Sequence, residues 1–173
     1  IVTETQGLDY EYAKDPQDQY RVFLPQVPEA LYARQIGEEG SNVIAYLKDD
    51  NNNGFTLVLT ANGGIDAPSE SNLLFGAKDT DNAWNANVKS VDLTNFRTDN
   101  ATTLAFLFNG SKSLETITGI EHLNTTQVQD LTAAFQYCAA LTNLDLSSWK
   151  TDNVTSVSNM FFQTTQLQTV TGM

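Results

Sequence analysis

The sequence predicts an α/β solenoid, a stack of strand-plus-helix units preceded by an N-terminal β-rich cap. From Val88 onward the chain aligns with itself at intervals of 26, 27 and 26 residues. Each interval joins a stretch of alternating apolar residues to a stretch with apolar residues at helical spacing. Two strand-like segments with an Asn- and Asp-rich loop between them precede the first interval. Units of this size bury their apolar faces only by stacking on one another.

Three full units and the start of a fourth make up residues 88–173. They begin at Val88, Leu114, Leu141 and Leu167. The apolar positions of the units align in columns. One column is phenylalanine in every full unit, at Phe108, Phe135 and Phe161. We therefore expect these three rings to stand in a single file inside the stack.

The two halves of a unit have different periods. In the third unit, Leu141, Leu144 and Leu146 have polar residues between them, which predicts a short strand. Residues 154–161 place apolar side chains at i, i+3 and i+7, which predicts a helix. Asp152 or Asn153 stands directly before this segment, where a helix N-cap is expected.

The segments LTNLDLSSWKTDNVTSVSNMF (141–161) and LETITGIEHLNTTQVQDLTAAF (114–135) resemble the BspA-like leucine-rich repeats of bacterial surface proteins. Those repeats read roughly L-x-x-L-x-L-S-x-[FW]-x-T-x-N-V-T-x-[ML]-x-x-M-F. The positions that match best are Trp149, Thr151, Asn153, Val154, Thr155 and Phe161. The resemblance covers residues 88–173. It implies a leucine-rich-repeat-like stack in a secreted or cell-surface protein, often an adhesin, without enzymatic activity.

The chain is predicted to have three parts. Residues 1–42 form an N-terminal arm with a short helix at 28–36, because Pro28 and Gly37 suit the two ends of a helix. Residues 43–87 form a β-rich capping region with a hairpin, and residues 88–173 form the repeats. The chain starts without a signal-peptide pattern and stops inside a repeat, which predicts a fragment or a processed form.

The charge of the chain narrows its partners. Asp and Glu outnumber Lys and Arg by 21 to 9, for a formal net charge of -12. This charge repels phosphate backbones and anionic surfaces, so we expect no nucleic-acid binding. No apolar run is long enough to insert into a membrane. The single cysteine, Cys138, aligns with Ser111 and Thr164, so we expect a buried structural thiol.

One loop invites a metal hypothesis. Asp49, Asn51, Asn53 and the following glycine match the first half of an EF-hand-type calcium loop. The twelfth position is Thr60 in place of the usual Glu, and the flanking segments read as strands. A solvated hairpin turn is the favoured interpretation, with calcium as the alternative. No other cofactor is predicted, and the lone His122 has no partners for a zinc site or a catalytic triad.

The outward-facing strand positions are the candidate binding residues. They form two rows: Ser90, Thr116 and Asn143, and Asp92, Thr118 and Asp145. A regular array of short polar side chains suits contact with an extracellular protein or glycan, although such residues are also the ordinary solvated side of a sheet. We therefore expect a non-catalytic adhesion module at a bacterial cell surface. The alternatives are a structural spacer and an accessory repeat segment of a larger secreted protein or enzyme.

Overall fold

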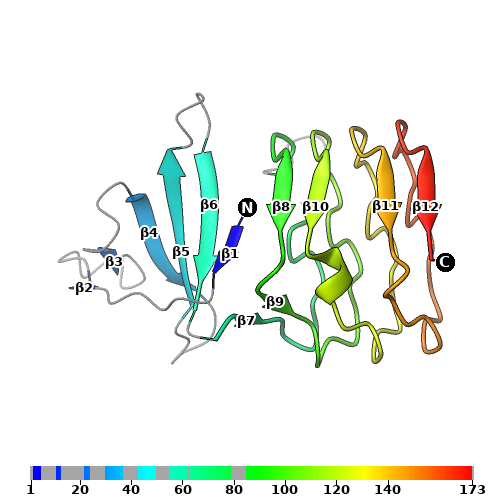
Figure 1. Cartoon of the computed structure of the whole chain (residues 1–173), viewed down its shortest axis with the longest axis horizontal. Helices are drawn as coiled ribbons and strands as arrows, with labels where there is room; N and C mark the ends of the chain where they lie inside the picture. The colour runs from blue at the N-terminus through cyan, green and yellow to red at the C-terminus, as the bar shows by residue number, and fades with distance from the viewer. Residues whose placement is uncertain are drawn as a thin grey trace. The chain divides into compact units, whose positions relative to one another are not determined.

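The computed structural model describes residues 2–4, 11–12, 22–23, 30–36, 43–49, 55–61, 63–78 and 85–172. The chain divides into two compact units, Ile1–Ile65 and Asp66–Met173. Strands and turns make up almost all of the described residues (Figure 1). Their only helical element is η1, a 3-10 turn at Ile120–His122.

The first unit contains a four-stranded sheet in the order β1-β6-β5-β4. Its strands are β1 (Val2–Glu4), β4 (Ala30–Ile36), β5 (Val43–Asp49) and β6 (Phe55–Thr60). β5 and β6 are antiparallel with Asp49 opposite Phe55, so the predicted hairpin is confirmed. Ile44, Tyr46 and Val58 are buried. A separate antiparallel pair joins β2 (Glu11–Tyr12) to β3 (Val22–Phe23).

The helix predicted at 28–36 is wrong. Ala30–Ile36 is the edge strand β4, and Arg34 lies opposite Ala45 of β5. The proline and glycine at the ends of the segment are compatible with a strand as well as with a helix. The open edge of β5 supplies backbone partners, and tertiary pairing of this kind overrides a weak local preference.

The second unit is a stack of coils in which equivalent positions of successive repeats lie side by side (Figure 1). Its strands are β8 (Ser90–Asp92), β9 (Phe96–Arg97), β10 (Thr116–Thr118), β11 (Asn143–Asp145) and β12 (Thr169–Thr171). The two-residue strand β7 (Ile65–Asp66) spans the boundary between the units. β8 pairs with β10, and β11 with β12, both in parallel. On another side of the coils, parallel bridges run from Glu70 through Thr103 and Asp130 to Ser156.

The predicted fold class, an α/β solenoid of strand-plus-helix units, is wrong because the second half of each coil is a series of overlapping turns. The amide of Met160 donates to the carbonyl of Val157 at 3.1 Å, and Phe162 donates to Asn159 at 3.0 Å. Asn159 has a φ of 55°, outside the helical region. Four-residue turns also place i beside i+3, so they produce the apolar spacing that the sequence analysis assigned to a helix.

Over residues 104–110 and 131–137, the hydrogen bonds between the turn halves run in one direction along the stack. Amides of the first full coil donate to carbonyls of the second, and amides of the second donate to the third. Phe108, for example, donates to Ala134, and Phe135 donates to Met160 at 2.9 Å. A helix would use these amides internally. Here alternate amides leave the coil, which is the physical reason why no helix forms.

The expected single file of phenylalanines is confirmed. Phe108 stacks on Phe135, and Phe135 stacks on Phe161, with ring centroids 5.7 Å apart in both pairs. Phe75 extends the file in the other direction, 5.7 Å from Phe108. The amide of Phe75 also donates to Leu107, as in the later coils. Part of the predicted capping region, residues 66–78, therefore stacks on the first repeat as a partial coil.

Candidate functional site: the polar strand face and its groove

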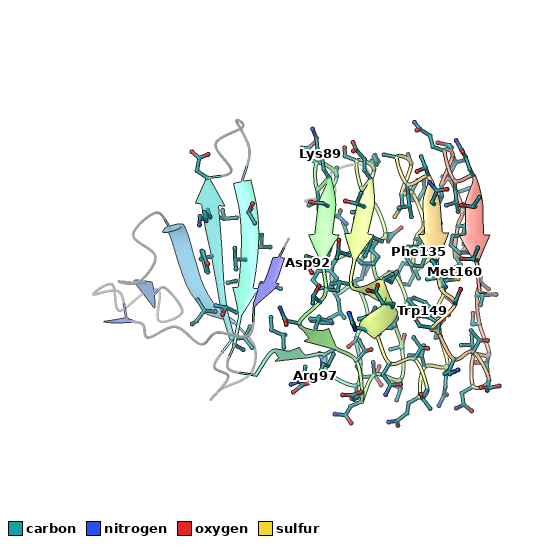
Figure 2. The ribbon with its side chains drawn as sticks, viewed as in Figure 1. Lys89, Asp92, Arg97, Phe135, Trp149 and Met160 are labelled. Atoms are coloured by element: carbon teal, nitrogen blue, oxygen red, sulfur yellow. The ribbon has the colours of Figure 1, made fainter. Side chains whose placement is uncertain are left out.

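The structure divides the two predicted polar rows into two strand pairs. Ser90 lies opposite Thr116, and Asp92 lies opposite Thr118, across β8 and β10. Asn143 and Asp145 of β11 lie opposite Thr169 and Thr171 of β12. Figure 2 shows Lys89 and Asp92 at the two ends of β8. We call these outward side chains of β8, β10, β11 and β12 the polar strand face.

The polar strand face is interrupted between β10 and β11. These strands belong to separate sheets, although their coils remain joined on either side of the interruption. At one end the amide of Ala140 donates to Lys112 at 3.1 Å. At the other end the indole Nε1 of Trp149 donates to the carbonyl of Ile120 at 3.2 Å, beside η1 (Figure 2).

An open groove of about 600 Å³ lies between these two closures. We call it the β10–β11 groove. It is lined by Glu115, Thr116, Ile117, Ile120, Glu121, Leu141, Thr142, Asn143, Leu144, Asp145, Ser147 and Ser148. Three of the six predicted binding residues, Thr116, Asn143 and Asp145, are among them. Ser90 and Asp92 lie on β8, away from this lining.

The position of the groove follows from an alternation between the coils. Gly119 and Gly172 occupy the position that Leu93 and Leu146 occupy in the other coils. A Cβ atom on Gly119 would stand 2.5 Å from the amide nitrogen of Thr94, so only glycine permits this approach. Gly172 approaches the preceding coil in the same way. Glycine therefore allows close backbone contact between the coils of β8 and β10 and between those of β11 and β12. At the junction between β10 and β11 the equivalent residue is Leu146, whose side chain does not allow the same approach.

Backbone polar groups face the groove. In a parallel pair, alternate residues of a strand direct their amide and carbonyl to the same neighbour. The carbonyl of Thr142 and the amide of Leu146 both bond to the coil of β12. The residues at the intervening positions, Asn143 and Asp145, therefore direct their backbone groups toward β10. The carbonyl of Thr118 in β10 accepts a hydrogen bond from the amide of Leu93, so Thr118 faces the coil of β8. By the same alternation, Ile117 directs its backbone amide and carbonyl toward β11.

The rim of the groove is acidic. Its charged residues are Glu115, Glu121 and Asp145, and no Lys, Arg or His belongs to the lining. The Oδ1 atom of Asp145 accepts hydrogen bonds from the Ser147 hydroxyl at 2.5 Å, the Ser147 amide at 2.9 Å and the Thr171 hydroxyl at 2.8 Å. These bonds, led by those from Ser147, hold the pKa of Asp145 below its ordinary value. Asp145 is thus a fixed negative charge at neutral pH.

The floor of the groove is aliphatic. Leu141, Leu144 and Ile120 are buried beneath it, and Ile117 is half-buried. The equivalent side chain in the closed β8–β10 pair, Val91, is 2% exposed. The added exposure of Ile117 is a consequence of the missing strand contact on its β11 side.

The other sequence hypotheses concern residues outside this face. Asp49 is exposed at the end of β5, while Asn51 and Asn53 lie outside the described residues, so the calcium loop stays a prediction. Within the described part of the chain, no three His, Cys, Asp or Glu side chains are grouped as a metal site. His122 is exposed in η1, with Nε2 3.5 Å from Glu121.

Cys138 is buried, and its thiol donates to the carbonyl of Phe108 with Sγ and O 3.4 Å apart. Burial raises the pKa of the Cys138 thiol to about 12. Thr164, in the same column of the next coil, donates its hydroxyl to Phe135 in the same way. The column therefore supplies a side-chain donor to the carbonyls of Phe108 and Phe135, which indicates that Cys138 has a structural role.

The groove was not among the sites predicted from the sequence. Two signals in the sequence point to it: the glycine–leucine alternation at positions 93, 119, 146 and 172, and the extra residue of the second repeat. That extra residue falls between Leu114 and Leu123, where η1 forms. Neither signal by itself shows that a strand pair opens, because the opening depends on which coils come into backbone contact.

The fold and this face define a class of protein: a stack of strand-and-turn coils with a polar outer face. The chain belongs to the family described as "Mycoplasma protein of unknown function, DUF285", whose model matches residues 78–172. Comparison with curated proteins and with solved structures gave no match. Among the described residues, no helix has the length and apolar character needed to cross a membrane.

Proposed function

We propose that this chain is a non-catalytic binding module that contacts an extracellular protein or glycan through the polar strand face. The observation that carries the proposal is the β10–β11 groove, which interrupts that face with unpaired strand edges, an acidic rim and an aliphatic floor. Grooves that combine an apolar surface with a few polar groups are the usual form of binding sites. The resemblance to BspA-like repeats favours a location at a bacterial cell surface.

The chemistry of the groove favours binding over catalysis. Its titratable side chains are Glu115, Glu121 and Asp145. A general acid or base works best with a pKa near the operating pH. Asp145 is shifted in the opposite direction by its hydrogen bonds to Ser147 and Thr171. A carboxylate held ionised in this way suits ion pairing or hydrogen-bond acceptance.

The proposal is tested by immobilising the full chain and measuring retention of mucin and of extracellular-matrix proteins. The test variant combines Asp92→Asn, Thr118→Val and Asp145→Asn, which removes two charges and a hydroxyl from the polar strand face. We expect the wild-type chain to retain at least one of these ligands. The triple variant should retain it up to about tenfold less, since three polar contacts at up to about 0.5 kcal/mol each are lost.

A matched control makes the same number of changes away from the polar strand face. It combines Glu70→Gln, Thr126→Val and Asp152→Asn, all exposed on turns or bridges of the coils. The control should retain the ligand as the wild type does. If the folded wild type retains none of the ligands, or if the test and control variants lose retention equally, the proposal is wrong and a structural spacer is the better description.

A further inference from the structure

We infer that the β10–β11 groove receives a lysine or arginine side chain presented by a basic partner protein. This inference rests on the proposed function and narrows its partner to a cationic protein segment. Three features of the groove carry the inference: its closed ends, its acidic rim and its aliphatic floor.

The closed ends determine how an occupant enters. A peptide strand added in the plane of the sheet would have to run past both ends of the opening. The bond from Ala140 to Lys112 blocks one end, and the bond from Trp149 to Ile120 blocks the other. The accessible path is therefore from the outer face, between residues 113–119 and 141–148. A single projecting side chain fits this path, whereas an extended backbone does not.

The charge of the groove determines the chemistry of the occupant. Glu115, Glu121 and Asp145 line the rim without a basic residue beside them in the lining. The chain as a whole carries a formal net charge of -12, which draws cationic partners toward it. The carbonyl groups that Ile117 and Asn143 direct into the opening are additional acceptors. An ammonium or guanidinium group supplies donors only, so it matches this set.

The floor of the groove fits the stem of such a side chain. Lysine and arginine bury their methylene groups along apolar surfaces while the charged head stays near polar groups. Ile117, Ile120 and Leu144 provide such a surface below the carboxylates. The lining holds no aromatic ring, the surface on which sugar rings commonly stack. A protein side chain is therefore the better match than a glycan.

The test is a titration of the full chain, labelled with ¹⁵N, at low salt. The probes are a tetralysine peptide, the same peptide acetylated at every Nε, and the neutral sugar chitotetraose. Tetralysine should shift the amide resonances of residues 115–121 and 141–148 more than those of 88–94. The acetylated peptide should lose this effect. Raising the salt concentration should weaken binding, because the rim charges are exposed to solvent.

Two equivalent aspartates provide the matched variants. Asp92 and Asp145 occupy the same column of the repeats. The Asp92 carboxylate accepts a hydrogen bond from the amide of Thr94, and the Asp145 carboxylate accepts one from the amide of Ser147. Only Asp145 lines the groove. Asp145→Asn should weaken tetralysine binding roughly two- to fivefold, within the range for an exposed ion pair, and Asp92→Asn should leave it unchanged. Equal weakening by both variants would mean general charge attraction and would overturn the inference.

A second variant guards against loss of folding. Asp145 accepts hydrogen bonds from Ser147 and Thr171, so its substitution can lower the stability of the chain. Thermal unfolding of Asp145→Asn is therefore measured in parallel. Glu115→Gln removes a rim charge that has no hydrogen bond within the described structure, with the exposed Glu70→Gln as its control. If Glu115→Gln binds tetralysine as tightly as Glu70→Gln does, the inference is wrong. Chitotetraose shifting the groove resonances in place of tetralysine would also overturn it.

The outcomes separate this inference from the proposed function. Suppose mucin or matrix retention depends on the polar strand face, but Asp145→Asn and Glu115→Gln leave it intact. The proposed function then stands, and the groove inference fails. If the wild type retains neither ligand class, yet tetralysine binds the groove with the expected variant pattern, the proposed function fails and the groove remains a cation site. Failure in both assays rejects both.

Discussion

Replacing Phe135 by alanine tests whether the phenylalanine file holds the coils together. The Phe135 side chain is fully buried and stacks between Phe108 and Phe161, with ring centroids 5.7 Å away on both sides. Truncating a buried phenylalanine to alanine costs about 3–5 kcal/mol. Each stacked ring pair adds about 0.5–1.5 kcal/mol beyond area burial. We therefore expect Phe135→Ala to lower the free energy of unfolding by about 4–5 kcal/mol.

Phe161→Ala is the matched comparison. Phe161 occupies the same column in the next coil, but it is only partly buried and stacks on Phe135 on one side. Its loss should cost about half as much, near 2 kcal/mol, because less apolar surface returns to water. Urea unfolding followed by tryptophan fluorescence measures both values, and similar m-values would show that the same unit unfolds. Equal losses for the two variants, or a loss below about 1 kcal/mol for Phe135→Ala, would refute the reasoning.

Three further predictions concern the coil junctions. Gly119→Ala should destabilise the chain by more than about 1 kcal/mol in urea unfolding, because residue 119 has a φ of 79° and the added Cβ atom would clash with Thr94. An unchanged unfolding midpoint would contradict the close approach of the two backbones. The Cys138 thiol should resist alkylation at pH 8 until denaturant is added, and fast labelling of the native chain would contradict its burial. Because folding favours the neutral thiol, the contribution of Cys138 to stability should fall as pH rises from about 9 to about 12. The amide of Phe161, which has no acceptor among the described residues, should exchange with deuterium far faster than that of Phe135, which donates to Met160. Comparable protection of the two amides would contradict the bonding pattern of the phenylalanine amides.

The file of phenylalanine rings, the β5–β6 hairpin and the polar rows on the strands could be predicted from residue patterns. The identity of Phe108, Phe135 and Phe161 at repeat spacing predicted one file of rings, because a conformation repeated along the chain returns equivalent side chains to equivalent places. The hairpin of β5 and β6 followed from two β-rich runs around a polar loop. The rows of Ser90 with Thr116 and of Asp92 with Thr118 followed from strand alternation.

The helix predicted for the second half of each repeat was wrong because its residue spacing fits two different conformations. Spacings of i, i+3 and i+7 are shared by an α-helix and by overlapping turns, and burial of one face does not distinguish them. What distinguishes them is where the amides bond. Phe135 donates to Met160 of the next coil, and this choice exists only once two coils are stacked. The strand β4 differs from its helical prediction for the same reason, because its partner is β5.

The sequence by itself determined the repeat length, the residues that fill the core, the acidic charge and the side chains that point outward. These depend on which residues stand at which intervals, and a single chain carries that information. Tertiary structure alone decided the turn conformation of each second half, the directed bonds between coils and the groove between β10 and β11. Those features depend on how closely one backbone approaches another, and Gly119 and Leu146 set that distance only when a neighbouring coil is present.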